Sequence, residues 1–277
     1  MAARRNAQAP EQAQEPEQEL EPAPVTAPPP GRLTARSVLA SALLGCEPPE
    51  LPVAYLVALA GLFGVNENRA RVALSRMVAA GEATTDGAAR YRLTGHLLER
   101  QERQRTSRAG ATRPWRGDWH LVVMTAVGGA ASQRRARRSV LQHARLAELR
   151  EGVWTRPDNV AIHALRNAGD VVVMAARTPE GVDPATHAAR LWDLEAWARR
   201  ARELLAALRA LEPAAYEDLA PGFELSAAVL RHLQADPLLP AELLPGDWPG
   251  RSLRESYDDW DGRYRALLRG WARSVPS

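Results

Sequence analysis

The chain has 277 residues, of which 45% are hydrophobic and 25% charged, and its formal net charge is only +3. This composition is typical of a globular protein with two or three modest domains, and it excludes a fibrous or largely disordered chain. The single cysteine, Cys46, excludes an internal disulfide framework and a cysteine-based zinc site, and it favours a reducing cytoplasm.

The first 31 residues have a composition of their own. They contain five Glu and two Arg, are rich in Gln, Ala and Pro, and end in Pro28-Pro29-Pro30-Gly31. Because they lack the apolar periodicity that buries a face, we predict a disordered, acidic, Pro-rich arm over residues 1–31. The arm has no apolar core of a secretory signal, and the longest apolar stretch, residues 52–65, is too short to cross a bilayer. We therefore expect a cytoplasmic protein with no membrane partner.

Three helices are predicted after the arm. Thr34 is a suitable N-cap for the first helix, which Gly45 ends, and Pro52 begins the second, which ends near one of the two following glycines. The third helix starts after the N-cap Asn66 and is closed by Gly81 at C′. One buried stripe is expected on this third helix, made by Ala70, Ala73, Leu74, Met77 and Val78.

A β-hairpin is predicted next, with strands over Glu82–Thr85 and Ala88–Leu93 joined by a type I′ turn at Asp86-Gly87. A polar helix over about residues 95–107 then follows as a linker. Three helices followed by a hairpin is the order of a winged helix-turn-helix, which we assign to residues 32–110.

The surface of the third helix opposite its buried stripe carries groups that can read DNA. Arg forms paired hydrogen bonds to guanine, Asn pairs with adenine, and Ser bonds a phosphate or a base. The predicted contacts from this helix and the hairpin are Asn66, Asn68, Arg69, Arg71, Val72, Ser75, Arg76, Arg90, Tyr91 and Arg92. We predict double-stranded operator DNA as the partner, which would associate the protein with the nucleoid. A merely solvated helix face and a winged helix that binds a protein stay open as alternatives.

The middle of the chain predicts a small α+β domain over residues 111–182. Strands are expected at 119–127, 153–156 and 170–176, and an amphipathic helix at 134–150. This order of strands and helices favours a ferredoxin-like fold. The helix is expected to bury Val140, Leu141, Leu146 and Leu149.

The remaining residues, 183–277, are expected to form a helical C-terminal domain. One uninterrupted helix is predicted over 185–211, with shorter helices near 225–234 and 253–271. The three carboxylates Asp258, Asp259 and Asp261 are expected on a solvated helix face or in a dimer contact. The fold class is therefore α+β multidomain, with a winged helix-turn-helix, a ferredoxin-like middle domain and a helical C-terminal domain.

Four groups of residues, in order along the chain, resemble the PaaX family of bacterial regulators over about residues 34–271. They comprise Arg71-Val72-Ala73-Leu74-Ser75-Arg76-Met77 with Gly81 and Tyr91-Arg92-Leu93-Thr94; Trp115-Arg116-Gly117-Asp118-Trp119 with Gly152-Val153-Trp154-Thr155-Arg156-Pro157; Leu191-Trp192-Asp193-Leu194; and Asp236-Pro237-Leu238-Leu239-Pro240 with Leu243-Leu244-Pro245 and Trp248-Pro249-Gly250.

The resemblance implies a repressor, acting as a homodimer, that controls the catabolism of phenylacetate or related aromatic compounds. It also implies an effector, an aryl-CoA thioester such as phenylacetyl-CoA, that releases the DNA. Aromatic faces and guanidinium groups suit the two ends of such a molecule. The candidate effector residues are Trp115, Trp119, Arg134, Arg138, Trp154 and Arg156. The alternatives are ordinary core tryptophans and an exposed arginine-rich helix start, which could also contact the DNA backbone.

No catalytic residue, metal site or cofactor is predicted, so we do not expect an enzyme. The six His are scattered without HxxxH or HExxH spacing, and no GxSxG, P-loop or GxGxxG sequence occurs. The middle domain of the family is similar to small nucleases of CRISPR systems, which carry an Asp where this chain has Met124-Thr125-Ala126-Val127. A metal-dependent nuclease that uses Asp118, and a protein-interaction module, stay open as alternatives.

Overall fold

The computed structural model describes residues 33–87, 89–125, 128, 130–162, 165 and 170–275. The predicted acidic arm lies outside these residues, and so do Ala88, Ala126 and Val127 from the predicted strands. None of the helices within the described ranges is long and apolar enough to span a bilayer.

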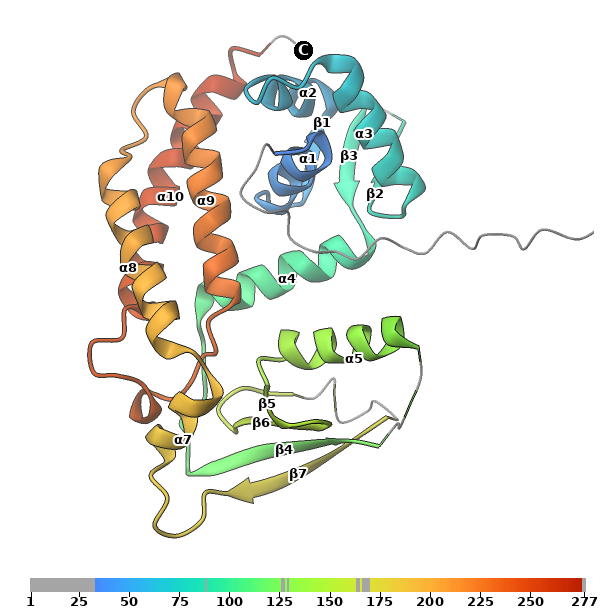
Figure 1. Ribbon diagram of the computed structural model, residues 1–277. Coiled ribbons are helices and arrows are strands. Elements are labelled where there is room, and N and C mark those ends of the chain that lie inside the picture. Colours follow the sequence, from blue (N-terminus) through green and yellow to red (C-terminus); the bar gives the residue numbers. More distant parts are fainter. Residues whose placement is uncertain are drawn as a thin grey trace, which may run out of the picture. The chain divides into compact units, whose positions relative to one another are not determined.

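Three helices begin the described chain (Figure 1): α1 (Ala35–Leu44), α2 (Val53–Gly61) and α3 (Glu67–Ala79). The predicted N-caps of the first and third are confirmed, because Thr34 Oγ1 accepts a hydrogen bond from the Ser37 backbone N–H and Asn66 Oδ1 accepts one from Arg69. Gly81 has φ +68°, as a residue that closes a helix at C′ requires.

A three-stranded antiparallel sheet lies beside these helices, in the order β1-β3-β2. Its strands are β1 (Glu50–Pro52), β2 (Ala83–Thr85) and β3 (Arg90–Leu93). Strand β1 corrects the prediction that Pro52 begins the second helix, because Pro52 is the last residue of β1 and α2 begins at Val53. Thr85 pairs with Tyr91 and residues 86–89 connect β2 to β3, so the predicted two-residue type I′ turn is wrong. Gly87 and Ala89 both have positive φ in this longer loop.

The polar linker helix is α4 (Gly95–Ala109), which ends at Gly110 with φ +61°. It packs against α1 and α9. Gln101 on its buried side donates a hydrogen bond to the Cys46 carbonyl at 2.8 Å. The helix is therefore tied to the N-terminal helices by specific polar contacts and is not a free connection.

The middle of the chain forms a four-stranded antiparallel sheet in the order β5-β6-β4-β7. Its elements are β4 (Asp118–Met124), α5 (Ala131–His143), β5 (Ala147–Arg150), β6 (Val153–Pro157) and β7 (Val171–Arg177). Val122, Leu141 and Trp154 are among the side chains buried together in this part of the molecule.

The predicted helix over 134–150 is too long. It ends at His143, because Arg145 has φ +61° and its guanidinium donates to the carbonyls of Gln234 and Asp236 at 2.9 and 2.8 Å. The following residues pair with β6 as strand β5. Leu141 and Leu146 are buried as predicted, whereas Val140 and Leu149 are 54% and 45% exposed.

The C-terminal segment contains α7 (Pro184–Leu191), α8 (Leu194–Ala210), α9 (Leu219–Gln234) and α10 (Gly250–Ala272), with 3-10 turns η1 (Tyr216–Asp218) and η2 (Ala241–Leu243). The predicted uninterrupted helix over 185–211 is wrong. Trp192 is extended, with φ −123° and ψ 135°, and Asp193 caps a new helix by accepting a hydrogen bond from the Ala196 N–H at 2.9 Å.

One continuous cluster of buried side chains joins the N-terminal helices to α8, α9 and α10. Aromatic pairs cross this junction: Tyr55 meets Trp271 edge-on at 5.6 Å between ring centroids, and Phe63 meets Phe223 at 5.2 Å. Residues 33–277 accordingly form a single compact unit. The chain is a mixed α+β protein with two antiparallel sheets among the described residues, and the domain boundaries at 110/111 and 182/183 stay a prediction.

Candidate nucleic-acid interface

Helix α3 has one fully buried and one exposed face. Ala70, Leu74 and Met77 are each 0% exposed, which confirms the predicted stripe at its centre. The residues predicted to contact DNA from this helix are all exposed: Asn66, Asn68, Arg69, Arg71, Val72, Ser75 and Arg76. The side chains opposite the core therefore stand in solvent, where a partner can reach them.

Hydrogen bonds on this face are few and local. Arg71 Nε donates to Glu67 Oε1 at 2.8 Å, and both side chains are more than half exposed. Ser75 Oγ donates to the Arg71 carbonyl at 3.1 Å. Exposed pairs at i and i+4 contribute only about 0.3–0.5 kcal/mol. The Arg71 guanidinium can therefore exchange its carboxylate partner for another acceptor at little cost.

Strand β3 carries the three predicted contacts of the hairpin. Arg90 and Arg92 are exposed and Tyr91 is half-buried. Both guanidinium groups are bonded to Glu50 on β1, with Arg92 Nε at 2.7 Å from Glu50 Oε2. These hydrogen bonds lower the pKa of the Glu50 carboxyl. Glu50 was not predicted as part of this surface because strand β1 was not predicted, and its carboxylate partly neutralises the hairpin's charge.

The six predicted effector residues do not share one site. Trp115 and Trp119 meet edge-on at 5.9 Å in one buried cluster, whereas Trp154 lies in another. Arg138 lies over the Trp154 ring at 5.5 Å and is also bonded to Glu148. Arg134 is exposed on α5. None of the six lines the cavity between the N- and C-terminal helices or the smaller cavity at Arg113, Asp118 and Asp158.

Arg156, the last predicted effector residue, is 0% exposed. Burial lowers the pKa of its guanidinium, whose donors reach the carbonyls of Ala144 and Pro157 and Asn159 Oδ1 at 3.1–3.2 Å. Asn159 in turn donates to the Leu238 carbonyl at 2.8 Å. These contacts hold the middle sheet against the loop that follows α9.

Two of the acidic residues singled out in the sequence, Asp118 and Asp261, are also hydrogen-bonded to arginines. Asp118 Oδ1 accepts a hydrogen bond from Arg177 at 2.7 Å. Asp261, expected in solvent or at a dimer contact, is 3% exposed and accepts from Arg108 and Arg265, each at 2.7 Å. No group of three or more His, Cys, Asp or Glu suited to a metal ion occurs among the described residues.

Residues 34–97 match the family described as PaaX-like protein, and residues 192–273 match the family described as PaaX-like protein C-terminal domain. A solved structure, that of an uncharacterized protein from Mycobacterium tuberculosis, is 40% identical in sequence. The alignment covers 86% of this chain and 98% of that one, with a TM-score of 0.66. No curated protein matches.

These matches indicate a protein of the transcriptional-regulator class. The chain belongs to the PaaX-like family, and the resemblance predicted from its motifs is confirmed.

Proposed function

We propose that the N-terminal module is a winged helix-turn-helix whose third helix, α3, reads double-stranded DNA in the major groove. The observation that carries this proposal is the division of α3 into a buried apolar stripe and an exposed face of Arg, Asn and Ser. The adjoining β2 and β3 strands supply the hairpin that such modules lay beside the groove. Membership of a regulator family supports the same conclusion.

The exposed side chains have distinct roles in this proposal. Arg71 offers a bidentate fork to guanine O6 and N7, and Asn68 offers an amide to adenine. Arg69 and Arg76, on the flanks of α3, contact phosphates. Arg90 on the hairpin adds a further phosphate contact. Such a contact fixes the position of the protein on the DNA without reading the base sequence.

We further propose a ferredoxin-like middle domain, which the sheet order β5-β6-β4-β7 with its antiparallel neighbours supports. The protein would act as a homodimer on two operator half-sites, as regulators with a helix-turn-helix commonly do. Together with its family, these features favour a non-enzymatic, cytoplasmic regulator that needs no cofactor.

The biological role rests on the family resemblance. We propose a repressor of an aromatic, phenylacetate-type catabolic operon whose DNA is released by an aryl-CoA thioester. Such an effector can act only if it binds the DNA-free conformation more tightly, so that DNA must weaken effector binding by the same factor.

A gel mobility shift on DNA from upstream of the gene tests both the proposed DNA reading and the proposed release by an effector. We expect a salt-sensitive complex that random DNA of equal length does not compete away, and its loss when phenylacetyl-CoA is added. The Arg71→Ala variant should lose this preference, whereas Arg209→Ala, at an exposed position on α8, should keep it. Equal binding to all duplexes contradicts the DNA-reading half, and an unchanged complex with phenylacetyl-CoA contradicts the effector half.

A further inference from the structure

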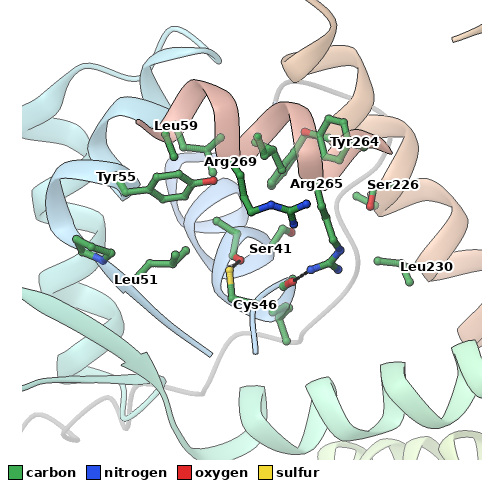
Figure 2. A pocket seen from close by; sticks show the side chains of 18 of the residues that line it. Ser41, Cys46, Leu51, Tyr55, Leu59, Ser226, Leu230, Tyr264, Arg265 and Arg269 are labelled. Carbon is green, nitrogen blue, oxygen red and sulfur yellow. Dashed lines mark hydrogen bonds between the residues drawn. The ribbon is translucent and has the colours of Figure 1, made fainter. Parts of the chain in front are cut away.

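A large cavity lies between the N-terminal helices and the C-terminal ones (Figure 2). Residues of α1, β1 and α2 form one wall, residues of α9 and α10 the other, and α4 adds Arg100 and Gln104. Its volume is about 1030 Å³. Small-molecule sites usually measure about 300–1,000 Å³, so the cavity is large enough for a sizeable organic ligand.

The lining of this cavity is apolar and basic. Its larger apolar side chains include Leu51, Tyr55, Leu59, Phe223, Leu230 and Leu268. Its arginines are Arg71, Arg90, Arg100, Arg231, Arg265 and Arg269. Figure 2 shows Arg265 and Arg269 reaching from α10 into the space between Tyr55 and Leu230. The one carboxylate among the lining residues, Asp261, is already bonded to Arg108 and Arg265.

Two of these arginines, Arg100 on α4 and Arg231 on the neighbouring helix α9, line the cavity and carry like charges. Burial lowers the pKa of Arg100, and the nearby charge of Arg231 lowers it further. Within the part of the chain that the structure describes, neither side chain makes an ion pair with a carboxylate, although most other arginines of the junction do. Like charges in a partly desolvated place repel each other, and an anion between them would remove that repulsion.

We propose that this cavity is a binding site for an amphipathic anion. The apolar body of the ligand packs between α2 and α9, and its carboxylate or phosphate is held by Arg100 and Arg231. Guanidinium groups are suited to both anions because they donate paired, charge-assisted hydrogen bonds. The aryl-CoA effector proposed above is one member of this chemical class.

The regulatory consequence rests on the proposed function. Arg71 and Arg90 line the cavity and also belong to the candidate DNA interface. While Arg100 and Arg231 hold its anionic head, a ligand that fills the cavity also contacts Arg71 and Arg90 and so competes with DNA for these two side chains. Ligand and DNA should therefore weaken each other's binding by equal factors.

Calorimetric titration of the full chain without DNA tests the site. The probes are octanoate, octyl phosphate and phenylacetyl-CoA, with octanol as the neutral control. We expect at least one anion to bind about tenfold more tightly than octanol, because the charged head forms hydrogen bonds that the hydroxyl cannot match. Binding of octanoate alone identifies a carboxylate ligand, and binding of the phosphate-bearing probes alone a phosphate ligand. Failure of all three anions, or equal binding of octanol, overturns the proposal.

Substitutions then locate the ligand. Arg100→Gln and Arg231→Gln should each weaken the anion about tenfold, while Arg209→Gln leaves its affinity unchanged. Because Arg100→Gln removes a repulsion, its melting temperature without ligand should not fall, which separates loss of binding from loss of folding. Ala227→Trp, which fills the cavity from α9, should abolish binding. Unchanged affinity in all three cavity variants overturns the location.

The single cysteine provides an independent readout, since Cys46 lines the cavity. Burial raises the pKa of its thiol, so alkylation with iodoacetamide is followed at alkaline pH. A bound anion should slow the reaction, and octanol should not. These measurements use no DNA, so a failure of operator binding leaves them intact, and a failure here leaves the DNA proposal standing.

Discussion

Exposure and hydrogen bonding differ between two groups of arginines. One group lies on α3, and the other lies at the junction of the N- and C-terminal segments. On α3 they are exposed, and Arg71 has only the exposed Glu67 as an acidic partner. At the junction, Arg254 is bonded to Asp236 Oδ2 and to the carbonyls of Ser107 and Gly250 at 2.8–3.1 Å. In a chain whose basic residues are all arginine, the number of donors already engaged distinguishes a side chain that holds the fold from one available to a partner.

The buried arginines connect segments that are distant in sequence. Arg145 reaches Ser107 on α4 as well as the end of α9, and Arg156 holds β6 to the loop before η2. Their acceptors are largely backbone carbonyls, each of which loses a hydrogen-bond donor when the guanidinium is removed. Substitution should therefore affect folding at the junction and DNA binding on α3.

The largest effect is expected for Arg156→Ala. Its truncation leaves several buried acceptors without a donor, so the free energy of unfolding should fall by about 3 kcal/mol or more. Urea denaturation followed by circular dichroism measures this change. Arg71→Ala is the control and should stay within about 0.5 kcal/mol of the parent protein. Equal stability of the two variants would show that buried arginines contribute no more to the free energy of unfolding than exposed ones do.

Asp261→Ala should come next. It deprives Arg108 and Arg265 of a carboxylate that is 3% exposed, and we expect a loss of about 2 kcal/mol in unfolding free energy. Asp259→Ala, two residues earlier on the exposed side of α10, should change stability by less than about 0.5 kcal/mol. The same urea titration compares the pair, and a greater loss for Asp259→Ala would contradict the assignment.

On α3, Arg71→Ala and Ser75→Ala should each weaken specific DNA binding by about 1–3 kcal/mol for every base that the truncated side chain no longer reads, with little change in stability. Fluorescence anisotropy with operator and scrambled duplexes measures the difference. Equal weakening on both duplexes would mean that these side chains touch only phosphates.

The smallest effects are expected on the hairpin. Arg90→Ala should reduce the slope of log affinity against log salt by about 0.9, uniformly across sequences. Glu50→Gln should act in the opposite direction, tightening DNA binding about twofold, because it releases Arg90 and Arg92 from a carboxylate. The pKa of Glu50 is lowered, so this carboxylate stays charged at neutral pH and its pairing is lost only as the pH falls below its ordinary range. Salt titrations of both variants and of the parent protein measure whether each substitution weakens or tightens DNA binding.

The sequence predicted α3 well because the signals for it are local. The N-cap Asn66, the apolar stripe and the closing Gly81 all lie within the helix or beside it. The strand β1 could not be predicted in the same way, because three residues that end in a proline become a strand only when β3 supplies a partner.

The end of α5 could not be predicted for a related reason. Leu146 continues the helical apolar pattern, and only Arg145, held by carbonyls from the far side of the chain, stops the helix before it. The tryptophans predicted to bind an effector lie in two separate hydrophobic clusters, where Trp119 and Trp154 are buried and Trp115 is partly buried. The basic cavity itself was not predictable, since its walls come from segments near the two ends of the described chain.

The most direct test of the DNA-reading face is a cleavage reagent attached to α3. In a Cys46→Ser background, Ala79→Cys places a thiol at the exposed end of this helix and Ala206→Cys places one on the exposed side of α8. With iron-EDTA tethered to each thiol, we expect DNA cleavage confined to a few base pairs within the operator for Ala79→Cys and none for Ala206→Cys. Cleavage from α8, or none from α3 while the protein is bound, would contradict it.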